Sequence, residues 1–136
     1  MHDYRELNII STKRCYWIDV TEQVTNCVLA SGVKSGICMV SSQHTTGGIT
    51  INENADPDVQ RDFFWKLARM VPEKQEYCHV EGNSDSHIKT SLVGLSVQVP
   101  VQNRHLVLGT WQSVYFCEFD GPRNRKVSVT ILGDAD

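Results

Sequence analysis

The sequence lacks the features that mark membrane, disulfide-rich and nucleic-acid-binding proteins. No apolar stretch approaches the length that spans a bilayer, and the first residues show no charged-then-apolar signal pattern. The five cysteines are irregularly spaced without a C-x-x-C pair, so we expect buried, reduced thiols and a cytoplasmic location. Basic residues are scattered and the net charge is −3, which argues against nucleic-acid binding. The one dense basic group, at 123–126, is predicted to be a solvated turn.

What the sequence contains is typical of a globular protein rich in strands. Its length of 136 residues fits one domain, which we expect to span 1–136. Alternating or apolar runs predict strands over residues 7–11, 15–20, 37–41, 49–52, 96–101, 105–108, 111–119 and 127–132. Helical spacing between capping and stop residues predicts helices from Thr21 to Gly32, from Asp56 to Pro72, and from Ser84 or Asp85 to Gly94. This pattern predicts an α+β fold, mostly antiparallel, with two or three helices.

Polar residues cluster where predicted strands end, at 41–48, 79–87 and 118–123. Loops in such places commonly carry function, and these contain His44, His79 and His87. Three imidazoles with one open position form a catalytic zinc-type site, so we predict that they bind a divalent transition metal there. Asp85 or Glu53 would orient a ligand imidazole. The alternative is that the three are ordinary loop histidines, and magnesium is the alternative metal.

Other residues near these loops suit an anionic ligand. Paired glycines let backbone amides approach a ligand, and the predicted helix start at 84–86 offers further amides, with Lys89 one turn on. Arg123 can clamp a phosphate through two hydrogen bonds. The alternatives are a tight turn for the glycines and a solvent-facing position for Lys89. The residues predicted to bind substrate or phosphate are Thr45, Thr46, Gly47, Gly48, Asn52, Trp111, Gln112 and Arg123.

One glutamate, Glu118, interrupts the otherwise apolar run at 115–119. A carboxyl group in such surroundings can have a raised pKa and act as a general acid or base. The alternative is a strand residue that faces solvent or an interface. The residues predicted to take part in catalysis are Glu118, Glu53, Asn83, Asp85 and Lys89.

Four segments resemble the signature segments of the YjbQ (UPF0047) family: residues 44–59, 79–89, 108–112 and 118–123. The resemblance covers nearly the whole chain in the expected order. It implies a compact α+β domain with a β-sandwich-like core, assembled as a homotrimer with its site near subunit boundaries. It also implies a secondary thiamine-phosphate synthase activity, which joins a pyrimidine pyrophosphate to a thiazole phosphate and releases pyrophosphate.

Such a reaction needs positive charge or a metal near the departing pyrophosphate. Lys89, Arg123, the glycine amides and a metal on the three histidines would supply it, so the expected substrate is a phosphorylated small molecule and the expected enzyme a metal-assisted transferase. Two alternatives stay open: another metal-dependent enzyme, such as a hydrolase, and a non-enzymatic protein that binds a metabolite or anion.

Overall fold

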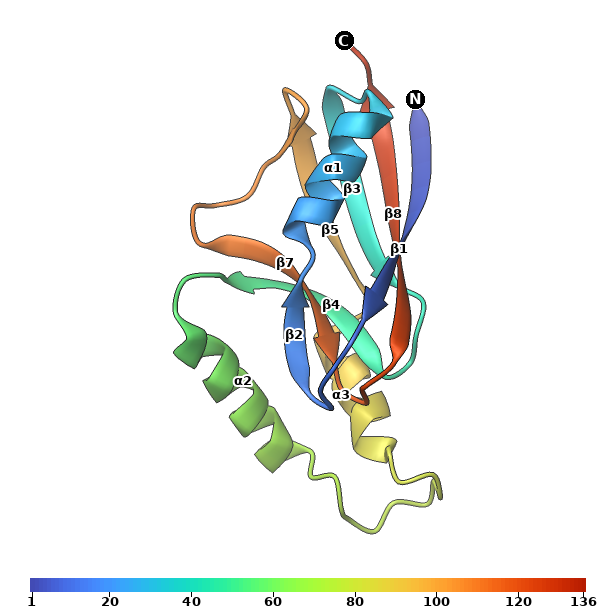
Figure 1. The fold of residues 1–136 in the computed structure, drawn as a ribbon, viewed down its shortest axis with the longest axis vertical. Helices are drawn as coiled ribbons and strands as arrows, with labels where there is room; N and C mark the ends of the chain where they lie inside the picture. Colours follow the sequence, from blue (N-terminus) through green and yellow to red (C-terminus); the bar gives the residue numbers. More distant parts are fainter.

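The computed structural model describes all 136 residues, and Figure 1 shows a chain of mostly strands interrupted by helices. The elements are β1 (His2–Ile10), β2 (Tyr16–Asp19), α1 (Thr21–Ser31), β3 (Ser35–Ser42), β4 (Gly47–Glu53), α2 (Pro57–Met70), α3 (Ser84–Val93), β5 (Ser96–Gln102), β6 (His105–Leu106), β7 (Gln112–Glu118) and β8 (Asn124–Asp134). None of the three helices combines the length and apolar character that a membrane crossing requires.

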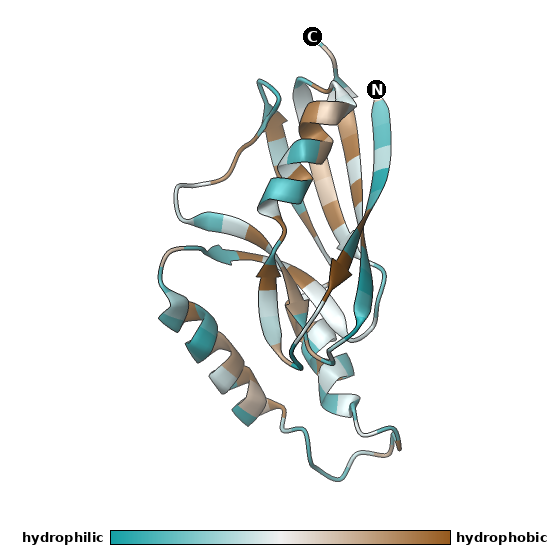
Figure 2. Ribbon diagram, in the orientation of Figure 1, coloured by the Kyte–Doolittle hydropathy of each residue, from teal (hydrophilic) through white to brown (hydrophobic).

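The strands form two sheets, and every strand pairing is antiparallel. One sheet has the order β1-β8-β3-β5-β6, and the other has the order β2-β7-β4. A core of 16 buried residues lies between them, with Val40 and Val129 from the larger sheet, Ile49 and Phe116 from the smaller one, and Val24 from α1. Figure 2 shows the hydrophobic residues concentrated along the strands behind α1. The predicted α+β class with sandwich-like sheets is confirmed.

Helix α2 packs outside the main core, on a separate aromatic cluster. Trp17 stacks on Tyr115 with ring centroids 4.5 Å apart, and Phe63 of α2 approaches Trp17 to 5.2 Å. No residue of α2 is fully buried, and in Figure 2 the helix alternates between hydrophilic and hydrophobic residues. The helix is therefore held to β2 and β7 by one apolar stripe and by the Gln60 side chain, whose Oε1 accepts from the Trp17 amide of β2 at 3.1 Å.

The amino-terminal capping residue was predicted correctly for α2 and wrongly for the other two helices, whereas Gly32 and Gly94 end α1 and α3 as predicted. The Asp56 carboxylate accepts a hydrogen bond from the amide of Asp58, as an N-cap does. Thr21 is the first residue of α1 rather than its cap, because its hydroxyl bonds the backbone of β7 by accepting from the Val114 amide at 2.8 Å. Helix α3 is preceded by Asn83, not capped by Ser84 or Asp85, and the Asn83 side chain makes no capping hydrogen bond.

The cysteines are free thiols, as predicted, but they are not all buried. Cys27, Cys38 and Cys117 lie in the core, and burial raises the pKa of Cys38 and Cys117 to about 12. Cys15 is half-buried and Cys78 is exposed. The prediction of five buried thiols is therefore wrong for these two.

Candidate functional site

A polar pocket of about 260 Å³ opens where three segments meet. They are the β3–β4 loop, the amino-terminal end of α3 with the residues just before it, and the β7–β8 connection. Nine residues line this polar pocket and none is hydrophobic: His44, Thr45, Thr46, Glu81, Asn83, His87, Asp120, Arg123 and Arg125. In Figure 1 the region lies around α3, in the lower part of the view.

Arg125, from β8, is held at the polar pocket by three hydrogen bonds. Its Nε donates to Glu118 Oε1 at 2.8 Å, and its Nη2 donates to the Thr46 carbonyl at 3.2 Å and to Glu118 Oε2. The side chain is 2% exposed, and its Nη1 makes no hydrogen bond within the chain. Arg125 therefore has one fixed, unused nitrogen at the pocket.

Glu118 is the buried partner of Arg125 and does not line the polar pocket. Burial alone raises the pKa of its carboxyl group, but the hydrogen bonds from Arg125 and from the Asp120 amide outweigh burial, so the pKa lies below its usual value. This is the opposite of the raised pKa expected of a general acid. The structure makes Glu118 the counter-charge that fixes Arg125.

Asp120 organises the rim of the polar pocket. Its carboxylate accepts from Asn83 Nδ2 at 2.8 Å and from Arg123 Nη2 at 3.0 Å, and its carbonyl accepts from Arg123 Nε at 2.8 Å. Arg123 is half exposed and Asp120 is largely buried. The β7–β8 connection and the start of α3 are thereby tied together at the pocket mouth.

His44 lines the polar pocket next to β8, with its tautomer fixed by the backbone. Its Nε2 accepts a hydrogen bond from the Lys126 amide at 2.8 Å. Burial, followed by the nearby Arg125 guanidinium, lowers the pKa of His44. The imidazole is therefore neutral at pH 7 with its proton on Nδ1, which leaves it one N–H donor.

The other two histidines lie side by side. The rings of His79 and His87 meet edge to face with centroids 5.4 Å apart, and His79 Nε2 is 4.0 Å from Glu81 Oε1. His87 also lines the polar pocket with His44. Within one chain, however, no three His, Cys, Asp or Glu side chains are placed to hold a metal ion together, and His44 Nε2 is already engaged. The metal remains a prediction.

Asp85 and Lys89 anchor α3 rather than line the polar pocket. Asp85 is 0% exposed, with Lys89 Nζ 2.8 Å and Arg14 Nη2 3.1 Å from its carboxylate. Burial alone raises the pKa of Asp85, but the hydrogen bonds from these two cations lower it below its usual value. The alternative of a solvent-facing Lys89 is wrong, because the residue is only 4% exposed.

Gly47 and Gly48 are buried where β4 begins, pairing with Glu118 and Cys117 of β7. A Cβ atom on Gly47 would lie 2.3 Å from the Phe116 ring, and one on Gly48 would lie 2.5 Å from the Gly94 carbonyl oxygen. The structure therefore gives these glycines a close-packing role, and neither lines the polar pocket.

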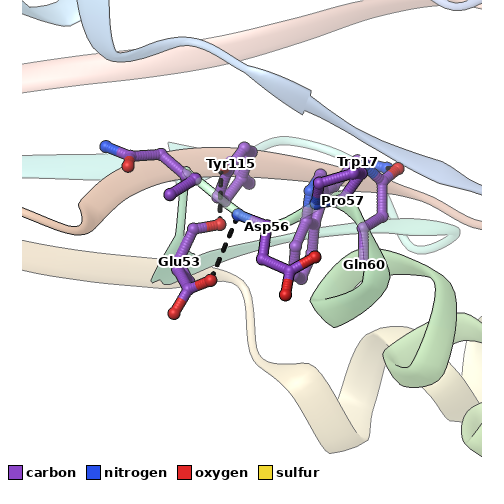
Figure 3. A pocket seen from close by; sticks show the side chains of 8 residues that line it. Trp17, Glu53, Asp56, Pro57, Gln60 and Tyr115 are labelled. Carbon is purple, nitrogen blue, oxygen red and sulfur yellow. Dashed lines mark hydrogen bonds between the residues drawn. The ribbon is translucent and has the colours of Figure 1, made fainter.

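Four of the predicted site residues lie at the far end of the same strands. Asn52 and Glu53 end β4, opposite Ser113 and Gln112 of β7, and Trp111 is exposed just before β7. Glu53 is six residue steps along the strand from Gly47, which is roughly 20 Å. Figure 3 shows the pocket of about 190 Å³ at that end, where Glu53 Oε2 accepts from the Asp56 amide beside Trp17 and Tyr115. The structure does not bring Asn52, Glu53, Trp111 or Gln112 to the histidines.

Sequence reasoning missed Arg125, Asp120 and Glu81 as members of the polar pocket. The turn predicted at 123–126 is wrong from Asn124 onward, where β8 begins, and Arg125 is buried. The sequence does contain a signal for a strand here, because Arg125, Val127 and Val129 are spaced two residues apart and therefore share the inward face of β8.

Comparisons with known proteins agree with this fold. A family model described as "UPF0047 protein YjbQ-like" matches residues 5–134. The UPF0047 protein YugU of Bacillus subtilis is 46% identical over 95% of this chain and 98% of the relative. A UPF0047 protein of Methanocaldococcus jannaschii is 46% identical over 93% and 91% of the two chains.

Solved structures give the same result. An uncharacterized YjbQ/UPF0047 protein of Clostridium acetobutylicum superposes with a TM-score of 0.93 at 51% identity, covering 94% of this chain and 99% of that one. A protein of unknown function from Sulfolobus solfataricus gives a TM-score of 0.95 at 29% identity, covering 98% and 99%. The chain therefore belongs to the YjbQ (UPF0047) family.

Proposed function

We propose that the polar pocket binds a phosphorylated small molecule and that the chain catalyses a group transfer of the thiamine-phosphate synthase type. The observation that carries the proposal is Arg125, a buried guanidinium held by Glu118 and the Thr46 carbonyl with Nη1 unused at a pocket without apolar lining. A guanidinium fixed in this way recognises phosphate oxygens at little entropic cost, because its geometry is set before the ligand arrives.

Other groups of the polar pocket support an anion. Arg123 adds a second guanidinium at the rim, His44 supplies one N–H donor, and Thr45 a hydroxyl. Each of these groups donates hydrogen bonds, which is the requirement for holding phosphate oxygens.

The proposed transfer requires the pocket to stabilise negative charge on a departing pyrophosphate. The new bond to the thiazole phosphate forms while the bond from the pyrimidine's carbon to pyrophosphate breaks, and the pyrophosphate leaves with the electron pair. Negative charge then grows on the departing oxygen, where Arg125 and Arg123 would stabilise it. Neither Glu118 nor Asp85 is free to move a proton, because both are buried in ion pairs.

Two neighbouring imidazoles support the metal part of the proposal. His79 and His87 would each give one ligand to a divalent transition metal, which would add positive charge beside the phosphate. A third ligand would have to come from outside this chain, so no step of the transfer is assigned to the metal here. Elemental analysis of the purified protein, compared with His79→Ala, tests this part without an activity assay.

The test measures binding and turnover separately. Titration calorimetry with inorganic phosphate is expected to show binding that Arg123→Gln weakens about tenfold, the value of one charge-assisted hydrogen bond. Arg61→Gln, at an exposed position of α2, serves as the matched control and should bind like the wild type. Equal affinities in wild type and Arg123→Gln would contradict the anion site. Incubation with both precursors, with and without divalent metals, tests for thiamine phosphate, and binding without product would contradict the transfer.

We also propose that three copies of the chain assemble. The outer face of the five-stranded sheet has no helix on it and carries a set of exposed apolar side chains in adjacent register: Tyr4, Ile37, Met39, Pro100 and Leu132. Ile37, at 54% exposure, pairs directly with Leu132 and Pro100, so these side chains form one contiguous surface.

Ile37→Lys is expected to convert the trimer to monomers, because it places a charge in the middle of this apolar surface. Light scattering coupled to size-exclusion chromatography measures the mass directly. Leu29→Lys on α1, where the side chain is similarly exposed at 52%, is the control that should stay trimeric. A monomeric wild type, or an Ile37→Lys variant with unchanged mass, would refute the assembly.

A further inference from the structure

A second cavity, of about 490 Å³, adjoins the polar pocket. Its lining is Thr45, His87, Thr90, Ser91, Gly94 and Leu95, and Thr45 and His87 line both spaces. No charged side chain faces the second cavity, whereas the polar pocket holds two arginines and two carboxylates. The two spaces therefore differ in chemistry and share one boundary.

Each of the two spaces is lined by one residue that carries an unpaired polar atom. In the whole chain only two buried side-chain polar atoms lack a hydrogen-bond partner, Asn83 Oδ1 and Thr90 Oγ1. Asn83 lines the polar pocket and Thr90, which is 3% exposed, lines the second cavity. A threonine inside a helix commonly donates to a carbonyl of the preceding turn, and Thr90 does not. Folded proteins rarely leave such groups unpaired, and ligand binding is one recognised reason.

From these observations we infer that the substrate spans both spaces: its phosphate lies in the polar pocket, and a neutral part that forms hydrogen bonds lies in the second cavity. This inference rests on the proposed function and adds the second half of the ligand. The neutral part is a ring or chain with a hydroxyl or amino group, because the cavity offers hydroxyls, an imidazole and apolar surface but no charge.

In this arrangement His87 lies at the junction of the two parts of the substrate. Because it lines both spaces, its imidazole lies beside the bond that joins the phosphate part to the neutral part. Thr45, on the shared boundary, is the other residue that contacts both parts. Thr90 and Ser91 then select the neutral part, whereas Arg123 and Arg125 select the phosphate.

The experiment compares two probes on the same protein: inorganic phosphate, and 4-(hydroxymethyl)phenyl phosphate, which carries a neutral hydroxylated ring. The wild type is expected to bind the aryl phosphate at least tenfold more tightly than phosphate by calorimetry. Ser91→Phe fills the second cavity from an exposed position of α3 and is expected to abolish this preference while phosphate affinity stays unchanged. Leu92→Phe, at the neighbouring exposed position outside the cavity, is the control that should retain the preference.

Thr90→Val provides a second, nearly isosteric test. It removes only the unpaired hydroxyl, so folding is expected to be unaffected, while affinity for the hydroxylated probe falls several-fold and phosphate affinity stays the same. Equal affinities of the wild type for both probes, or loss of both in Ser91→Phe, would overturn the two-part ligand and leave the phosphate site standing. Absence of phosphate binding in the wild type would instead refute the proposed function, and with it this inference.

Discussion

Replacing Arg125 with methionine is expected to lower the free energy of unfolding by about 3–5 kcal/mol, because it leaves a buried carboxylate without its partner. Glu118 is 0% exposed and takes two of its hydrogen bonds from this guanidinium. Urea denaturation at pH 7, followed by circular dichroism, measures the change. The same variant loses the fixed nitrogen of the polar pocket, so phosphate binding should disappear as well.

Two control variants distinguish the effect of leaving a buried carboxylate unpaired from the effect of removing a positive charge. Arg123→Met removes a guanidinium that is half exposed, and it should change stability by less than about 0.5 kcal/mol. The double variant Arg125→Met with Glu118→Leu removes both charges and should regain most of the lost stability. If Arg125→Met lowered the free energy of unfolding by less than about 1 kcal/mol, Glu118 would not depend on Arg125 as its counter-charge, contrary to this account.

Lys89→Met is expected to cost about 3 kcal/mol, because it leaves the fully buried Asp85 with Arg14 as its only cation. The loss should fall on α3, which is also held by the Ser86 hydroxyl, 2.6 Å from the Phe119 carbonyl just after β7. Lys66→Met, at an exposed position of α2, is the matched control and should leave stability unchanged.

The effect of Lys89 should depend on pH in a defined direction. The pKa of Asp85 is lower in the folded chain than in the unfolded one, so at acid pH the unfolded chain binds more protons and stability rises with pH. The stabilisation is present above the ordinary pKa of an aspartate and is lost as the pH falls through the folded pKa. Wild type and Lys89→Met should therefore differ most at neutral pH and converge in acid. A constant difference across the acid range would contradict this account.

Local patterns predicted the architecture well because each strand and helix carries its own signal. The Asp56-Pro57 start of α2, the inward alternation of β8 and the apolar runs of β3 and β7 are all visible in the sequence. Helix ends were harder to predict where a side chain had a tertiary partner. Thr21 does not cap α1, because its hydroxyl bonds the backbone at Val114, far away in sequence.

The candidate site was harder to predict because residues close in sequence separate in an antiparallel sheet. His44 and Glu53 flank the same strand, β4, and the strand's length carries them to opposite ends. Arg125 and Glu118, each interpreted alone, looked like a turn residue and a catalytic acid. Only their pairing shows that one neutralises and positions the other. This contact joins a strand of one sheet to a strand of the other, and local sequence patterns do not specify how two sheets pack together.

The separate aromatic cluster beneath α2 has a consequence for motion in the folded state. Because α2 shares no residue with the main core, its amides should exchange with deuterium before those of β3 and β8, through an opening that leaves the sheets intact. The chain runs directly from α2 into the segment that carries His79 and Glu81. Glu81 of the polar pocket is thus joined in sequence to a helix outside the main core, whereas Arg125 stands on β8, whose valines belong to that core.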